Sequence, residues 1–248
     1  MKILIVIPAR GGSKGLKNKN IMPLLGKLLI GYTIDAAKQS ELADKIVVST
    51  EDGNIAACAK SYDIQVIDRP LEYATDEAPI EWALRHAVTW LKEKEGYSAD
   101  IVVWIQANVP IRKKGQIDHV IKKMIDTNAD SVITVIEVTQ RPEYMKKMVE
   151  GDKIVHMALP KEVRRQEYKE NLYVADGAVL AMRADVLMKT EGMTGAHIYL
   201  GTDIRGVVEE PQYAIEIDDQ FDYDLAEGFL IVEQKRKQSG RENFISRN

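Results

Sequence analysis

The chain opens with Lys2-Ile-Leu-Ile-Val-Ile-Pro-Ala-Arg-Gly-Gly-Ser-Lys-Gly15, in which an apolar run leads directly into a glycine-rich basic loop. Every side chain from Ile3 to Ile7 is apolar, as expected of a strand that is buried on both faces. Strands of this kind occur in parallel sheets that helices cover on both sides. Because α/β proteins bind ligands at the carboxyl ends of their strands, the loop after Ile7 is a candidate binding site.

The same pattern repeats along the chain and predicts an α/β fold. Short apolar runs, which we interpret as strands, alternate with amphipathic stretches, which we interpret as helices. The predicted strands cover residues 2–7, 45–50, 64–67, 100–105, 130–136, 153–157, 177–182, 207–208 and 214–217. The predicted helices cover residues 28–39, 53–61, 79–95, 115–127 and 221–237. We therefore predict one domain over residues 1–248, built on a mostly parallel, twisted sheet flanked by helices.

The pattern loosens between residues 139 and 171, where Pro142, Gly151 and Pro160 interrupt a charged stretch. We interpret this segment as an arm inserted into the domain, with a short strand near residues 153–157. Regular structure is expected to resume after the arm.

Composition narrows the class of protein. The chain has 248 residues, of which 45% are hydrophobic and 29% charged, and its formal net charge is -4. This mildly acidic balance argues against a nucleic-acid-binding protein, which would need a basic face. The single cysteine, Cys58, excludes an internal disulfide and a multi-cysteine metal site, and a reducing cytoplasm is the expected location. Membrane insertion is not expected, because every apolar run is far shorter than the roughly 18 residues of a membrane-spanning helix.

The loop after the first strand has the features of an anion-binding site. Its glycines allow backbone N–H groups to turn towards a negative charge. Four cations lie within ten residues: Arg10, Lys14, Lys17 and Lys19. A triphosphate would satisfy both features, although the spacing matches neither a Walker A loop nor the Gly-x-Gly-x-x-Gly fingerprint of dinucleotide-binding proteins. The alternative is a solvent-exposed basic loop that binds nothing.

Glu216 and Asp218 form a second candidate site. They alternate along the predicted strand near residues 214–217, and residues two apart in a strand point to the same face. Two carboxylates on one face can bind Mg²⁺ through oxygen ligands. The alternative is a pair of ordinary surface acids at the end of a strand.

Several motifs resemble those of the acylneuraminate cytidylyltransferases, the CMP-sialic acid synthetases. Residues 8–15 with Lys19-Asn20 resemble the signature loop of that family. Further similarities follow in the family's order: Val47 to Asp52, Arg69-Pro70 with Ala74-Thr75-Asp76, Gln106 to Arg112, Asp176-Gly177-Ala178, and Glu216-Ile-Asp218 with Asp222. The resemblance covers roughly residues 3–225 and implies the fold of the nucleotide-diphospho-sugar transferases.

The resemblance implies transfer of CMP from CTP to an acidic 2-keto sugar, with release of pyrophosphate and a requirement for Mg²⁺. The implied catalytic residues are Arg10, Lys19 and Asp218, because cations would neutralise the triphosphate while Asp218 holds the metal with Glu216. The implied nucleotide contacts are Ala9, Arg10, Gly11, Ser13, Lys14, Lys19, Asn20, Arg69 and Asp76. The implied acceptor contacts in the same subunit are Gln106 and Arg112, with the alternative that Arg112 simply begins the following helix.

The arm at residues 139–171 resembles the family's dimerisation segment, so a homodimer is expected. In that family the segment completes the sugar pocket of the neighbouring chain. The resemblance therefore implies that Arg164, Arg165 and Tyr173 contact the sugar there, with Lys161 as a further cation. The alternative for the three cations is a solvent-exposed basic helix face.

Three differences from the family pattern fall near the expected cleft. Ala107-Asn108-Val109 replaces Pro-Thr-Ser, Pro79-Ile80 replaces paired small hydroxyl residues, and Asp176 replaces Asn. Loss of hydroxyl groups that would bond a substrate indicates a changed acceptor. We therefore expect a pseudaminic- or legionaminic-type sugar rather than N-acetylneuraminate. The alternatives are a nucleotidylyltransferase for another sugar or nucleotide, and a non-catalytic nucleotide-sugar-binding protein.

Overall fold

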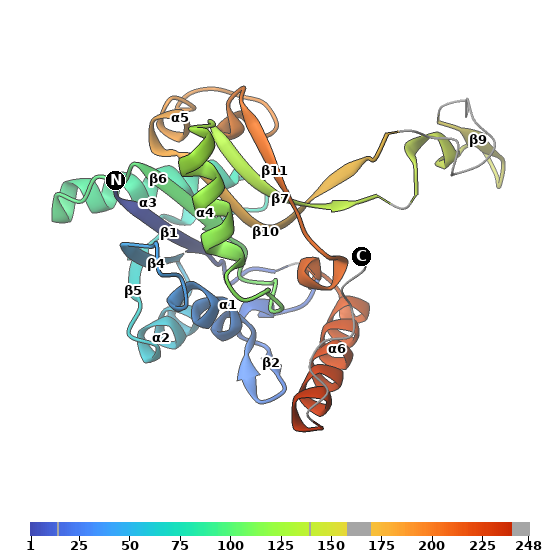
Figure 1. Ribbon diagram of the computed structural model, residues 1–248, viewed down its shortest axis with the longest axis horizontal. Helices are drawn as coiled ribbons and strands as arrows, with labels where there is room; N and C mark the ends of the chain where they lie inside the picture. The colour runs from blue at the N-terminus through green and yellow to red at the C-terminus, as the bar shows by residue number, and fades with distance from the viewer. Residues whose placement is uncertain (14, 139, 158–169, 240–248) are drawn as a thin grey trace.

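The computed structural model describes residues 1–13, 15–138, 140–157 and 170–239, and its centre is a seven-stranded sheet (Figure 1). The strands of this sheet are β1 (Ile3–Pro8), β4 (Lys45–Thr50), β5 (Gln65–Asp68), β6 (Ile101–Ile105), β7 (Ser131–Glu137), β10 (Tyr173–Arg183) and β11 (Ile204–Val208). Their order is β11-β7-β10-β6-β1-β4-β5. Neighbours are parallel except that β10 runs antiparallel to both β6 and β7. The predicted α/β fold with a mostly parallel sheet is confirmed.

Side chains of β1 fill the cores on both faces of the sheet. Ile3, Ile5 and Ile7 belong to one core, and Leu4 and Val6 belong to the other. All five are nearly or completely buried, because β1 lies between β4 and β6 in the middle of the sheet. Burial contributes roughly 1.5–3 kcal/mol for each side chain of this size. The apolar run at the start of the chain is therefore explained by its central position.

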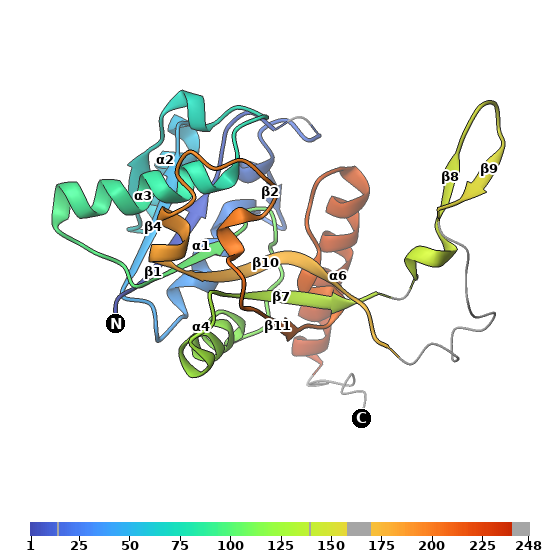
Figure 2. The same cartoon turned by 90° about the horizontal axis from the view of Figure 1, so that it is seen from above.

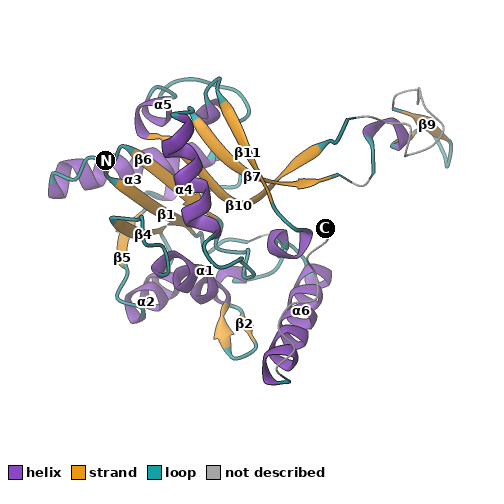
Figure 3. Cartoon of the chain, viewed as in Figure 1, coloured by secondary structure: helices purple, strands orange, loops and turns teal. Residues whose placement is uncertain are grey.

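Helices cover both faces of the sheet (Figure 3). They are α1 (Leu29–Lys38), α2 (Gly53–Ser61), α3 (Ile80–Glu95), α4 (Gln116–Thr127), α5 (Ala184–Met188) and α6 (Gln220–Gln238). One face packs against α1, α2 and α4, the other packs against α3 and α5, and α6 packs in a smaller core with Leu24, Ile111 and Ile217. The five predicted helices are confirmed, and α5 is a short additional one. None of the described helices combines the length and apolar character needed to cross a membrane.

Two acid-rich turns near the carboxyl edge of the sheet are explained by helix capping. Asp52 caps α2, because its carboxylate accepts the N–H groups of Asn54 and Ile55. Asp219 and Asp222 form a reciprocal capping box at the start of α6. A cap of this kind contributes about 1 kcal/mol. These three acids therefore have structural roles next to the candidate site.

A two-stranded hairpin lies beyond the ends of β7 and β10, away from the sheet (Figure 2). It pairs β8 (Lys146–Met148) with β9 (Ile154–His156) in antiparallel register. The predicted strand near residues 153–157 is thereby confirmed. Within the predicted arm, residues 139 and 158–169 lie outside the described residues, and with them Lys161, Arg164 and Arg165. A second small hairpin, β2 (Pro23–Leu24) with β3 (Lys27–Leu28), precedes α1.

Two strand predictions need correction. β10 extends beyond the predicted residues 177–182, because its first part, from Tyr173, pairs with β7 alone. The predicted strand at residues 214–217 is wrong, since Pro211–Ala214 form a 3₁₀ turn and the chain then runs on outside the sheet. The physical reason is that the segment bonds to a loop instead of a strand: the Ile217 N–H donates to the carbonyl of Asn108, which follows β6, at 2.9 Å.

Candidate active site

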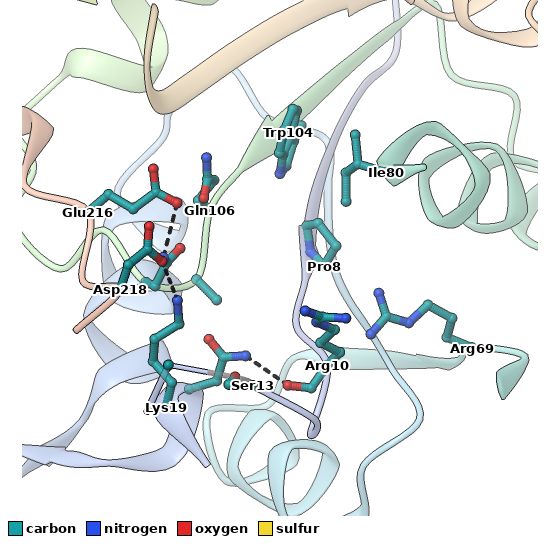
Figure 4. Close-up of a pocket in the computed structure, with 14 residues that line it drawn as sticks. Pro8, Arg10, Ser13, Lys19, Arg69, Ile80, Trp104, Gln106, Glu216 and Asp218 are labelled. Carbon is teal, nitrogen blue, oxygen red and sulfur yellow. Dashed lines mark hydrogen bonds and ion pairs between the residues drawn. The ribbon is translucent and has the colours of Figure 1, made fainter. Parts of the chain in front are cut away.

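A pocket of about 440 Å³ opens at the carboxyl ends of β1 and β6 (Figure 4). Three segments contribute most of its lining: residues 9–20 (the cation loop), residues 106–109 (the β6 loop) and residues 216–218 (the acid segment). The residues that line it are Pro8, Arg10, Ser13, Gly15, Lys19, Asn20, Arg69, Ile80, Trp104, Gln106, Ala107, Asn108, Glu216 and Asp218. The loop that the sequence singled out therefore borders a cavity.

The cation loop is fixed from beneath by an ion pair. Arg69 Nη2 donates to Glu51 Oε2 at 2.6 Å, and the two side chains are only 4% and 13% exposed. The other oxygen of Glu51 accepts the Gly11 N–H at 2.7 Å. A Cβ at Gly11 would overlap the Asp52 carboxylate, so the loop can approach this closely only with glycine there. Glu51 therefore joins Arg69 and the loop into one unit.

Arg10 and Lys19 already have carboxylate partners. Arg10 Nη2 lies 2.6 Å from Asp76 Oδ1, and the Arg10 carbonyl accepts a hydrogen bond from Asn20 Nδ2 at 3.0 Å. Lys19 Nζ lies 2.6 Å from Asp218 Oδ1. An anionic ligand in this pocket would compete with the two carboxylates for the cations.

The cation loop and the acid segment share one wall of the pocket, although Lys19 and Asp218 are 199 positions apart in the sequence. Their backbones also touch, because a Cβ at Gly15 would overlap the carbonyl oxygen of Asp218. Figure 4 shows Lys19 reaching up to Asp218, with Glu216 above it. The predicted anion site and the predicted pair of acids thus belong to a single site.

Asn108 connects the two acids. Its Nδ2 lies 3.1 Å from Glu216 Oε1, 3.1 Å from the Ile217 carbonyl and 3.3 Å from Asp218 Oδ1. All three neighbours are acceptors, so the amide nitrogen rather than the amide oxygen must face them. The pKa of Glu216 is raised overall, because burial and the charge of Asp218 outweigh the opposing effect of the Asn108 hydrogen bond. The acids therefore stay together although their segment is not a strand.

Part of the pocket lining away from the acid segment is apolar. Figure 4 shows Pro8, Ile80 and Trp104 grouped there. Trp104 is only partly buried, and its Nε1 is enclosed without a hydrogen-bond partner in the described part of the chain. The pocket therefore offers an apolar patch in addition to the charged groups of the acid segment, Lys19, Arg10 and Arg69.

Arg112 holds the β6 loop from behind. Its guanidinium donates to four oxygens: Gln106 O at 2.7 Å, Thr33 Oγ1 at 2.9 Å, Ala178 O at 3.2 Å and Val109 O. Desolvation lowers the pKa of Arg112 to about 9, and Asp176 acts in the opposite direction. Arg112 does not line the pocket but lies behind it, which corrects its predicted contact with the acceptor. The alternative, that Arg112 begins the following helix, is also wrong, because α4 begins at Gln116.

Gln106 is held between the β6 loop and β10. Gly177 has a φ of 71°, a conformation that favours glycine. A Cβ at this position would overlap the side-chain amide nitrogen of Gln106. Gly177 therefore makes room for Gln106, which lines the pocket as predicted.

The structure brings half of the predicted site residues to the lining of the pocket. Those that line it are Arg10, Ser13, Lys19, Asn20, Arg69, Gln106, Glu216 and Asp218. Four others lie behind it or beside it: Ala9 and Gly11 within the loop, Asp76 against Arg10, and Arg112 behind the β6 loop. Tyr173 lies exposed at the start of β10, while Lys14, Arg164 and Arg165 fall outside the described residues.

Sequence reasoning did not identify Glu51, Trp104 or Asn108 as site residues. A signal for Glu51 existed, because β4 and β5 are parallel with Thr50 opposite Asp68, so the next residues, Glu51 and Arg69, leave the sheet side by side. Asn108 was considered only for the hydroxyl that it replaces, not for the two hydrogens that its amide donates. Trp104 gave no signal, since an aromatic residue within an apolar run is typical of a core.

Comparison with known proteins gives the family. A sequence model described as cytidylyltransferase matches residues 4–243, almost the whole chain. The protein is a member of the cytidylyltransferase family. This cytidylyltransferase is 26% identical over 238 residues to the N-acylneuraminate cytidylyltransferase of Escherichia coli. The aligned region covers 95% of this chain and 53% of that protein. The chain thus spans about half the length of that relative.

Two further similarities concern the full length of the matched proteins. The cytidylyltransferase is 27% identical over 236 residues to the CMP-N,N'-diacetyllegionaminic acid synthase of Legionella pneumophila, covering 95% of this chain and 99% of that protein. It also resembles the solved structure of CMP:2-keto-3-deoxy-manno-octonic acid synthetase complexed with CTP. The TM-score is 0.72 at 19% identity, covering 94% of this chain and 100% of the other. This likeness confirms the expected nucleotide-diphospho-sugar transferase-like fold.

Proposed function

We propose that this cytidylyltransferase transfers CMP from CTP to an acidic 2-keto sugar of the nonulosonate type. The observation that carries the proposal is the 2.6 Å contact between Lys19 Nζ and Asp218 Oδ1. It joins a cation suited to a triphosphate and a carboxylate suited to a metal, at the sheet edge where α/β proteins bind ligands. The anomeric hydroxyl oxygen would bond to the α-phosphorus as the bond to pyrophosphate breaks. The hydroxyl proton would leave to a pocket carboxylate or to water.

Arg10 and Lys19 are the residues proposed to stabilise the leaving pyrophosphate. Phosphoryl transfer depends mainly on positioning and on neutralising charge, which two cations at the ends of one loop can supply. For this they must exchange Asp76 and Asp218 for phosphate oxygens. Transfer of Lys19 to the nucleotide would remove its bond to Asp218 Oδ1 and leave Asp218 with more freedom to bind a cation.

Mg²⁺ is the cofactor that the acid segment suits. Glu216 and Asp218 offer hard oxygen ligands, and Asn108 bonds to only one oxygen of each. No group of three or more His, Cys, Asp or Glu within the described residues could hold a metal ion by itself. Mg²⁺ commonly binds through one or two carboxylates with water and substrate phosphates completing its shell, so this donor set fits. When bound, the ion would neutralise part of the triphosphate charge.

The acceptor that the pocket favours is a sugar with apolar substituents. Pro8, Ile80 and Trp104 cannot hydrogen-bond the hydroxyl groups of a fully hydroxylated sugar, apart from the indole N–H. A legionaminic- or pseudaminic-type sugar carries methyl and acylamino groups where other nonulosonates have hydroxyls, and it would leave fewer hydroxyls unpaired against this wall. The similarity to a CMP-N,N'-diacetyllegionaminic acid synthase supports the same choice.

A homodimer formed through the arm is part of the proposal. Met145, Met148 and Ile154 are exposed on or beside the β8–β9 hairpin, and Tyr173 and Val174 are exposed at the start of β10. Apolar side chains grouped on the surface in this way are typical of an interaction site. Analytical ultracentrifugation is expected to give a dimer at micromolar concentration, and a monomer would contradict this part. A cytoplasmic location also stays a prediction.

The test of the reaction is pyrophosphate release with CTP, Mg²⁺ and a panel of acidic sugars. The panel contains N-acetylneuraminate, N,N'-diacetyllegionaminate, pseudaminate and 3-deoxy-manno-octulosonate. We expect release with a diacylated nonulosonate. Tight CTP binding without release for any sugar would favour a non-catalytic nucleotide-sugar-binding protein. Release with another nucleotide or sugar class would favour a different nucleotidylyltransferase.

Substitution of Lys19 tests its proposed role. Loss of one group that stabilises charge in the transition state typically lowers turnover by about 10²–10³-fold, and we expect that from Lys19→Ala. Lys17→Ala is the matched control, because Lys17 is an exposed cation of the same loop that does not line the pocket. Equal rates for the two variants would show that Lys19 has no special place in the reaction.

A further inference from the structure

We propose that Asn108 is a positioning residue that sets the affinity of the site for a divalent cation by holding Glu216 and Asp218 as a pair. The inference deepens the proposed function and rests on the acid segment as the metal site. It concerns a residue of the β6 loop that none of the predicted catalytic, nucleotide or metal roles includes.

The contacts of Asn108 leave half of each carboxylate available. Its Nδ2 is 3.1 Å from Glu216 Oε1 and 3.3 Å from Asp218 Oδ1. Lys19 binds the same Oδ1 of Asp218. Within the described residues, Oε2 of Glu216 and Oδ2 of Asp218 accept no hydrogen bond. One oxygen of each acid is thus fixed by the protein, and the other can bind a cation.

Asn108 is itself held firmly. The residue is 7% exposed. Its side chain donates to the Ile217 carbonyl at 3.1 Å, while its own carbonyl accepts the Ile217 N–H at 2.9 Å. This double bridge fixes the β6 loop against the acid segment, so the amide cannot turn away without breaking backbone contacts. A rigid donor is what a preorganised metal site requires around its ligands.

The chemistry of the amide suits two acids better than a hydroxyl would. Two carboxylates close together repel each other, and the repulsion must be offset while no cation is present. An amide nitrogen carries two hydrogens, which it shares among the two acids and the Ile217 carbonyl, whereas a serine or threonine hydroxyl donates only one. Groups that orient metal ligands from behind typically change metal affinity by about 10–100-fold when removed.

A purely structural role for Asn108 predicts a different result. If the residue only joined two loops, its removal would lower thermal stability and leave the cation affinity of folded protein unchanged. If it positions the acids, cation affinity falls even where the melting temperature is retained. The two roles are therefore separated by measuring cation binding and stability on the same samples.

The experiment is titration of nucleotide-free protein with Mn²⁺ alone, followed by electron paramagnetic resonance of free Mn²⁺. We expect Asn108→Ala to weaken binding by about 10–100-fold, and Asn108→Thr, which keeps one donor, to fall between it and the wild type. Asn54→Ala is the matched control, because Asn54 is an exposed asparagine of α2 that does not line the pocket. If Asn108→Ala fails to fold, Asn108→Thr decides the question.

A double-mutant cycle with Glu216→Gln asks whether Asn108 acts through the acid pair. The loss of Mn²⁺ affinity on Asn108→Ala should be markedly smaller in the Glu216→Gln background than in the wild type, because one acceptor is already changed. Full additivity would overturn the inference, as would wild-type Mn²⁺ affinity in folded Asn108→Ala or in Asn108→Thr. Absence of Mn²⁺ binding to the wild type would overturn it too. The proposed function fails separately, by absence of pyrophosphate release from every sugar.

Discussion

The two loops that border the pocket are each held by an arginine, but in different ways. Arg69 reaches the cation loop through a carboxylate, since Glu51 bonds both Arg69 and the Gly11 N–H. Arg112 reaches the β6 loop directly, through backbone carbonyls that include those of Gln106 and Ala178. We call these two supports the first and the second brace. The first is the ion pair between Arg69 and Glu51, and the second is the Arg112 cation surrounded by neutral acceptors.

The difference matches the charges of the two loops. The cation loop gathers several positive side chains, and the carboxylate of the Glu51–Arg69 pair holds the loop backbone without adding a further net positive charge beneath it. The β6 loop carries the neutral amides of Gln106 and Asn108, so it needs fixed geometry rather than compensating charge. We therefore expect loss of the first brace to leave an unpaired buried charge, and loss of the second to leave unpaired carbonyls.

The largest effect is expected from Glu51→Gln. It leaves the Arg69 guanidinium, whose side chain is 4% exposed, without its counter-charge. Breaking a buried ion pair from one side costs about 3–5 kcal/mol, to be measured as the free energy of unfolding in urea. Glu95→Gln is the control, because Glu95 pairs with Lys45 near the surface, where a salt bridge contributes little. Similar losses of unfolding free energy in the two variants would show that the Glu51–Arg69 pair contributes no more than an ordinary surface ion pair.

The next effect concerns the contact between the cation loop and the acid segment. Gly15→Ala places a Cβ against the carbonyl oxygen of Asp218 and should push the two apart. A displacement of about 1 Å in a reacting site can cost 100-fold in rate, so we expect kcat/KM for pyrophosphate release to fall by about that factor. In Gly12→Ala the added Cβ meets nothing within 4 Å, so this control should react normally. Equal activity of both variants would mean that the close contact is unimportant.

Much of the fold followed from the sequence because its decisive features are local. The apolar run of β1, the amphipathic helices and the glycine-rich loop each depend on neighbouring residues, and parallel strands bring their ends to one edge. The resemblance to a known family, rather than strand geometry, placed Lys19 and Asp218 in one site before their contact was known. The 3₁₀ turn at Pro211–Ala214 could not be predicted, because the segment that follows is held by Asn108 from a distant loop.

Arg112 shows why some side chains were misplaced. Its position seven residues after the end of β6, at the carboxyl edge of the sheet, resembles that of a substrate-binding arginine. Local spacing cannot show that four protein oxygens already occupy its guanidinium. Such saturation depends on β10 and α1, which are far away in the sequence. Long-range contacts of this kind, and not residue type, decide which side chains line the pocket and which hold its loops in place.

A smaller loss of stability is expected from Arg112→Met. The substitution keeps the volume but removes the guanidinium from the carbonyls of Gln106 and Ala178. Within the described residues, only the Gln106 carbonyl keeps a second side-chain donor, the Thr33 hydroxyl at 3.2 Å. Each unpaired buried carbonyl costs about 1–3 kcal/mol, partly recovered if water enters. Arg112→Lys should restore little, because an ammonium lacks the planar fork that reaches several oxygens. Full rescue by lysine, measured by urea unfolding, would show that charge rather than geometry holds the β6 loop.

The smallest effect tests whether Asp176 makes the second brace an ion pair after all. Burial raises the pKa of Asp176 above its usual 3.8, and hydrogen bonds from Thr134 and Ala178 and the charge of Arg112 only partly oppose this. The folded protein therefore holds this proton more tightly than the unfolded chain does, so ionisation costs stability as the pH rises through the window just above 3.8. Asp176→Asn removes that dependence.

Urea unfolding of both proteins between pH 4 and pH 8 measures this effect. The free energy of unfolding of the wild type minus that of Asp176→Asn should fall as the pH rises from about 4, and then level off once the folded carboxyl is ionised. Asp126→Asn, at an exposed position of α4, serves as the control for changing a carboxylate to an amide. A difference that instead rises with pH would mean that Asp176 stabilises Arg112 as Glu51 stabilises Arg69, and the contrast between the two loops would be lost.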